Sequence, residues 1–141
     1  MVSTPFYTVI DHTADVGIEV EAASREALFT NSGLAMFDLM FGLRSVDGNV
    51  TKPLSVTADN PTELLVAWLN ELLYFYAVDK IIFSSFTGVR LGEKEFRAVG
   101  CGEYFDPGKH RCDLEIKAAT YHDVSVALIE GRWKARVIFD V

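Results

Sequence analysis

The chain has 141 residues, a length that suits one domain with a substantial hydrophobic core. Half of its residues are hydrophobic and 12% are aromatic, a composition that excludes intrinsic disorder. The 20 acidic residues outnumber the 13 lysines and arginines and give a net charge of −7, which argues against tight binding to a nucleic-acid backbone. We therefore expect a single domain over residues 1–141.

Segments for export or membrane insertion are not visible in the sequence. Residues 1–5 lack the basic segment that begins a signal peptide. No apolar run reaches the ~18 residues that a membrane helix needs. The two cysteines, Cys101 and Cys112, are too few for a disulfide framework. The sequence thus predicts a reduced cytoplasmic protein that does not bind membranes.

The first predicted elements are a strand and a helix. Residues 16–22 alternate between apolar and polar positions, as a half-buried strand does. Ser24 is a favourable N-cap for a helix that runs to about Phe41. This helix is predicted to bury Leu28, Phe29, Ala35, Met36, Leu39 and Met40. A polar loop over residues 44–52 then leads to a short alternating strand at residues 54–58.

The second helix has the clearest boundary in the sequence. Asn60 is a capping residue, Pro61 stands at the first helical position, and Glu63 follows three residues after the cap. The helix is predicted to run to about Ala77, with an apolar surface that extends almost all the way round. Such a helix is either sandwiched inside the core or partly offered to a partner, and the first interpretation is favoured.

From Ile81 onward the pattern is that of β-strands. Strand-like runs occupy residues 81–86, 96–99, 114–118, 121–129 and 132–141. The last two runs flank a Glu130-Gly131 turn and predict a C-terminal hairpin. The sequence therefore predicts an α+β fold in which two amphipathic helices pack on mainly antiparallel β-sheet layers.

Acidic groups stand near both ends of the chain. The sequence DHTAD at residues 11–15 places two carboxylates and an imidazole directly before a buried strand, where unsatisfied charges are costly. Asp140 and the terminal carboxylate of Val141 close the last strand. Our hypothesis is that the two ends meet and that Asp15, Asp140 and Val141 share a hard divalent cation, since oxygen ligands suit Ca²⁺ or Mg²⁺. The residues alone favour a plainer interpretation, in which Asp15 bonds to its own turn and Asp140 pairs with an arginine.

Other chemistry has little support. Four residues of zinc-binding types lack the paired spacing of a structural zinc site: Cys101, His110, Cys112 and His122. There is no nucleophile elbow, P-loop or dinucleotide-binding glycine motif. Lys117 shares a strand face with Glu115, where an exposed ion pair would contribute little stability.

Several segments, taken together, resemble the archease family. They span nearly the whole chain in order and read DHTAD at 11–15, TELL at 62–65, WLNELL at 68–73, GE at 102–103, EIKAATYH at 115–122 and VIFDV at 137–141. The resemblance implies a small α+β protein that assists the RtcB-type RNA ligase of tRNA splicing and RNA repair. An archease does not ligate RNA itself; it promotes guanylylation of the ligase and permits multiple turnover.

The resemblance also implies roles for individual residues. The metal ligands of the family match Asp15, Asp140 and Val141, and a lysine important for activation matches Lys117. Secondary candidates are His12 and His122. Ca²⁺ is the expected metal, with Mg²⁺ or Mn²⁺ as alternatives, and the expected partner is the ligase rather than nucleic acid.

Two functions of other classes stay open at this point. A free-standing metal-dependent hydrolase would use the Asp/His cluster to activate water against a phosphoester. A structural interaction module would instead use the apolar helix over residues 64–76, and its binding would be indifferent to chelators.

Overall fold

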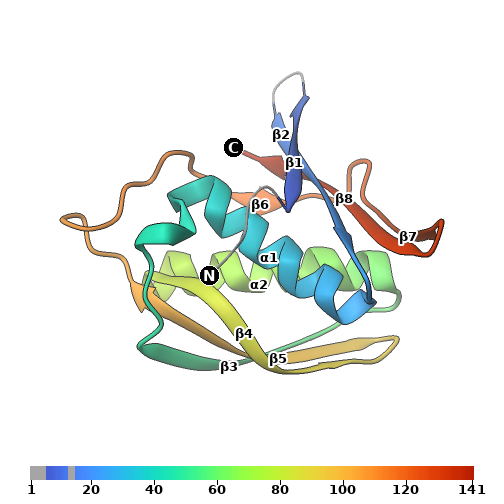
Figure 1. Cartoon of the computed structure of the whole chain (residues 1–141), viewed down its shortest axis with the longest axis horizontal. Coiled ribbons are helices and arrows are strands. Elements are labelled where there is room, and N and C mark those ends of the chain that lie inside the picture. The colour runs from blue at the N-terminus through green and yellow to red at the C-terminus, as the bar shows by residue number, and fades with distance from the viewer. Residues whose placement is uncertain (1–5, 13–14) are drawn as a thin grey trace.

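Two helices lie between two antiparallel β-sheets in the computed structural model, which describes residues 6–12 and 15–141 (Figure 1). The elements in chain order are β1 (Tyr7–His12), β2 (Asp15–Ala22), α1 (Arg25–Phe41), the short 3-10 helix η1 (Leu43–Ser45), β3 (Val50–Thr57), α2 (Pro61–Asp79), β4 (Ile81–Leu91), β5 (Glu95–Tyr104), β6 (Ala118–Ala119), β7 (Ser125–Ile129) and β8 (Arg132–Asp140). The predicted α+β class, with mainly antiparallel sheets and a C-terminal hairpin, is confirmed.

Both helices begin where the capping residues predict. The Ser24 hydroxyl accepts a hydrogen bond from the backbone N–H of Ala27 at 3.1 Å. The Asn60 side chain does the same for the backbone N–H of Glu63 at 2.9 Å. Each cap satisfies one of the N–H groups that the first helical turn leaves without a partner. Helix α2 ends at Asp79, and its C-cap residue, Lys80, takes the left-handed conformation with φ of 60°.

Helix α2 is apolar almost all the way round because it has a sheet on either side. It contacts β3, β4 and β5 of one sheet and β6 and β7 of the other. Trp68, at its centre, is 0% exposed, and its indole N–H donates to the Phe29 carbonyl of α1 at 2.9 Å. Only the C-terminal half carries large exposed apolar side chains, Tyr74 and Val78. Most of helix α2 is therefore buried in the core, as predicted.

Within the described residues, no helix is long and apolar enough to cross a membrane.

The second strand, β2, and the last strand, β8, are neighbours. The five-stranded sheet has the order β1-β2-β8-β6, with β7 also paired to β8, and the three-stranded sheet has the order β3-β5-β4. Strands β2 and β8 run antiparallel, with Val16 opposite Phe139. Since β2 and β8 lie beside each other in the middle of their sheet and run antiparallel, the start of β2 and the end of β8 lie together at one of its margins.

Several element boundaries differ from the predictions. Strand β1 was not predicted, and β3 begins at Val50, inside the predicted polar loop, because it pairs with β5 as an edge strand. Of the predicted strand at residues 114–118, only Ala118 lies in a strand, the two-residue β6, and β7 begins at Ser125 rather than Tyr121. In α1, Leu39 is only partly buried, whereas Phe37, which was not predicted to be in the core, is completely buried.

A buried histidine anchors the long loop between β5 and β6. The Nδ1 atom of His110 accepts the backbone N–H of Asp106 at 2.9 Å, which leaves Nε2 to donate to Glu103 at 2.7 Å. Lys109 bridges the carboxylates of Glu103 and Asp47. The hydrogen bond from Lys109, more than any other contact, lowers the pKa of Glu103 from 4.5 to about 2. His110 is thus a structural residue.

Replacing Glu103 with glutamine should flatten the acid dependence of stability. Because the folded-state pKa of Glu103 lies below its ordinary value, the stability that its charge contributes is complete above pH 4.5 and is lost as the pH falls toward about 2. The melting temperatures of wild type and E103Q should therefore converge between about pH 5 and pH 2. Thermal melts at a series of pH values test this, and a constant difference across that window would contradict it.

Candidate functional site

The pairing of β2 with β8 aligns the two predicted acidic ligands. Val16 lies opposite Phe139, and one further step in the same register brings Asp15 opposite Asp140. Opposite residues of antiparallel strands point to the same face of the sheet. Since Ile18 belongs to the core, alternation places Asp15 and Asp140 on the other face, away from the helices.

Strand β6 brings Lys117 to the same margin. Ala118 pairs with Asp140, and the backbone N–H of Lys117 donates to the Asp140 carbonyl at 2.8 Å. The side chains of Lys117 and Asp140 are exposed, whereas Asp15 and Val141 are partly buried. Three segments far apart in the sequence therefore meet here, and they carry all four residues that the resemblance singles out.

The chemistry of this set fits a hard cation. Two aspartate carboxylates and the terminal carboxylate of Val141 offer only oxygen donors, which Ca²⁺ and Mg²⁺ prefer. Three protein ligands would leave coordination positions for water or for atoms of a partner. Within residues 6–12 and 15–141, no group of three or more His, Cys, Asp or Glu side chains is arranged for metal binding.

The histidines differ in where they lie relative to this margin. The backbone of His12 pairs with that of Asp15, but the His12 side chain and residues 13–14 lie outside the described residues. His122 is exposed in the turn after β6, with its Nε2 atom 3.4 Å from an Asp123 carboxylate oxygen. His110 lies in the loop between β5 and β6, where its Nε2 atom is hydrogen-bonded to Glu103.

An apolar contact that the sequence did not reveal lies two residues further along the strands. Ile138 falls on the polar face of β8 yet is 0% exposed. Its side chain covers Gly17, where an added Cβ would lie 2.6 Å from the Ile138 Cδ1 atom and 2.9 Å from the Val137 carbonyl oxygen. A glycine inside a strand is the usual signal of such a close approach. This contact supports the backbone next to Asp15 and Asp140.

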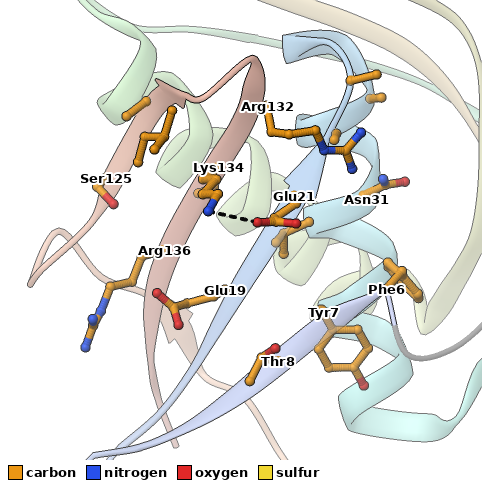
Figure 2. A pocket seen from close by; sticks show the side chains of 17 residues that line it. Phe6, Tyr7, Thr8, Glu19, Glu21, Asn31, Ser125, Arg132, Lys134 and Arg136 are labelled. Atoms are coloured by element: carbon orange, nitrogen blue, oxygen red, sulfur yellow. Dashed lines mark ion pairs between the residues drawn. The ribbon is translucent and has the colours of Figure 1, made fainter.

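Beyond that contact lies a groove of about 680 Å³, lined by side chains of this face together with residues of α1, among them Ala27 and Asn31. Figure 2 shows Arg132, Lys134 and Arg136 of β8 along it, with Glu19 and Glu21 of β2. Lys134 pairs with Glu21 at 3.0 Å. The Arg136 Nε atom is buried and has no hydrogen-bond partner among the described residues. Because the three cations face two carboxylates, the groove has little net charge and does not by itself identify an anion site.

Comparisons with known proteins agree on one family. The sequence model of the Archease protein family (MTH1598/TM1083) matches residues 7–141. Protein archease of Methanosarcina mazei is 34% identical over 139 residues, covering 96% of this chain and 95% of that protein. Protein archease of Pyrococcus furiosus is 35% identical over 136 residues, with coverage of 93% and 95%.

Solved structures give the same picture. The solution structure of protein 1598 of Methanobacterium thermoautotrophicum superimposes with a TM-score of 0.81 at 29% identity and covers 96% of this chain and 99% of that one. An archease of Thermotoga maritima, described as a possible chaperone, gives a TM-score of 0.62 at 18% identity, with coverage of 100% and 98%, which shows a shared fold. From the family match over nearly its whole length and from these relatives, the chain belongs to the archease family.

Proposed function

We propose that this protein is an accessory factor that activates an RtcB-type RNA ligase, promoting its guanylylation and multiple turnover in tRNA splicing or RNA repair. In this proposal Asp15, Asp140 and the terminal carboxylate of Val141 hold a divalent cation, which we expect to be Ca²⁺. Lys117 acts beside them on the ligase or its nucleotide. The protein itself makes and breaks no covalent bond.

The observation that carries the proposal is the convergence of β2, β6 and β8. The register of β2 with β8 aligns Asp15 with Asp140, and the backbone hydrogen bond from Lys117 to Asp140 adds a lysine to the same margin. Two acidic side chains and a lysine from three separate segments thus lie at one margin, on a face that does not pack against the helices. Membership of the archease family supports an accessory role.

Each group has a distinct task in this proposal. A cation bound with open positions would supply positive charge and bind oxygen atoms of a partner or its nucleotide. By sharing the cation, the two aspartates would hold the start of β2 and the end of β8 together. The exposed Lys117 ammonium is free to approach a phosphate or carboxylate and make a charge-assisted hydrogen bond with it. The acidic chain as a whole, with a net charge of −7, would favour approach to a basic surface.

One assay separates this proposal from its rivals. Multiple-turnover RNA ligation is measured with the ligase alone, with this protein added, with chelator-treated protein and after Ca²⁺ is restored. We expect stimulation by the native protein, loss after EDTA treatment and recovery with metal. Phosphoester hydrolysis by the isolated protein would favour the hydrolase. Ligase binding and stimulation that are insensitive to chelator would favour a structural interaction module.

A further inference from the structure

Among the residues that the structure describes, strand β6 has a strand neighbour, β8, on one side only. Toward β8, the N–H of Lys117 donates to Asp140 and the N–H of Thr120 donates to Ile138, at 2.8 and 3.0 Å. The Thr120 hydroxyl also donates to the Ile138 carbonyl at 2.8 Å. Ala119 lies between Lys117 and Thr120, and its N–H and carbonyl groups form hydrogen bonds on the side away from β8. Ala119 is only 5% exposed, so these groups need partners within the protein.

The side chain of Asn70, on helix α2, supplies both partners. Its Oδ1 atom accepts the N–H of Ala119 at 2.8 Å, and its Nδ2 atom donates to the Ala119 carbonyl at 3.1 Å. The amide therefore takes the place that the peptide group of a further strand would occupy. Of the twenty residues, only asparagine and glutamine carry a neutral side-chain acceptor and donor in this amide arrangement.

We propose that Asn70 is a positioning residue for the candidate site. It holds β6 between α2 and β8 and so keeps Lys117 beside Asp140, although its side chain bonds to neither of them. The functional part of this inference rests on the proposed roles of Lys117 and Asp140. The structural part, the clamp on β6, rests on the two hydrogen bonds alone.

Replacing Asn70 with leucine, which has a similar size and no polar atoms, tests the clamp directly. The variant leaves the N–H and carbonyl of Ala119 without partners, which favours detachment of β6 from its neighbours. Amide hydrogen exchange at residues 117–120 should accelerate by about tenfold or more. Ca²⁺ should bind more weakly, and stimulation of the ligase should fall, because the end of β8 loses its support.

Leu54→Ala is the matched control for a general loss of stability. Leu54 is a core residue, 3% exposed, on β3 of the other sheet. L54A should lower the melting temperature at least as much as N70L, yet leave Ca²⁺ affinity and ligase stimulation unchanged. Asn70→Asp keeps the acceptor for the Ala119 N–H but places a carboxylate oxygen against the Ala119 carbonyl in place of the donor, so it should also accelerate exchange at residues 117–120.

The outcomes are separable from those of the proposed function. Wild-type exchange at residues 117–120 in N70L would overturn the clamp. Equal losses of Ca²⁺ affinity and stimulation in N70L and L54A would overturn the positioning role. If the wild-type protein fails to stimulate the ligase, the proposed function is wrong, and hydrogen exchange together with Ca²⁺ titration still decides the role of Asn70.

Discussion

Asp140→Asn and Asp15→Asn should each reduce stimulation of the ligase to the level measured without this protein. Asparagine keeps the size of each side chain but removes the negative charge that a bound cation requires, so the loss should exceed about tenfold in turnover. The measurement is multiple-turnover RNA ligation with the ligase in catalytic amounts. Stimulation by either variant at the wild-type level would contradict the proposed role of that aspartate.

Two further variants accompany this experiment, one as a control for the loss of an acid and one as a test of Lys117. Asp113→Asn removes an exposed acid that pairs with Arg111 in the loop before β6, and it should leave stimulation unchanged. Lys117→Ala should lower stimulation while the melting temperature stays near that of wild type, because the side chain is exposed. A large loss of thermal stability in K117A would instead show that Lys117 is a structural residue.

Trp68→Ala should cause the largest loss of stability among single substitutions in helix α2. Trp68 is 0% exposed, and its ring packs against Phe86 and Phe96 with centroids 5.1 and 4.5 Å away. Removing so large a buried ring costs about 3–5 kcal/mol, and the indole hydrogen bond to Phe29 is lost as well. Urea unfolding monitored by circular dichroism measures the free energy of unfolding.

Two controls isolate the contribution of packing at this position. Trp68→Phe keeps an aromatic ring and loses the N–H donor, so it should cost clearly less than W68A. Tyr74→Ala removes an exposed ring from the same helix, 59% exposed, and should change the free energy of unfolding by less than about 1 kcal/mol. A loss of under 1 kcal/mol in W68A would contradict the sandwiched position of α2.

Local signals predicted the helices well and the short strands poorly. The Asn60-Pro61 start of α2 contains its own capping chemistry, so its boundary was visible in the sequence. Strand β6 has only two residues, and its place depends on β8 and on the Asn70 side chain. Strand β1 is likewise defined by its pairing with β2. Such contacts join distant segments, and no local pattern encodes them.

The same distinction applies to the candidate site. Asp15 and Asp140 could be singled out because acids next to buried strands are conspicuous, and alternation along β8 placed Asp140 on the polar face. Alternation also placed Ile138 on that face, but it gave no sign that Ile138 is buried against Gly17. The role of Asn70 was hidden for a similar reason, since a polar residue on an apolar helix has an evident task only once its partner is known.

Titration of the wild-type protein with Ca²⁺ by isothermal calorimetry, beside Asp15→Asn and Asp140→Asn, tests the central claim most directly. If both ends of the chain hold one cation, the wild type should bind a single Ca²⁺ per chain and each variant should lose that binding while remaining folded. Unchanged Ca²⁺ binding by either variant, or no binding by the wild type, would contradict a shared site.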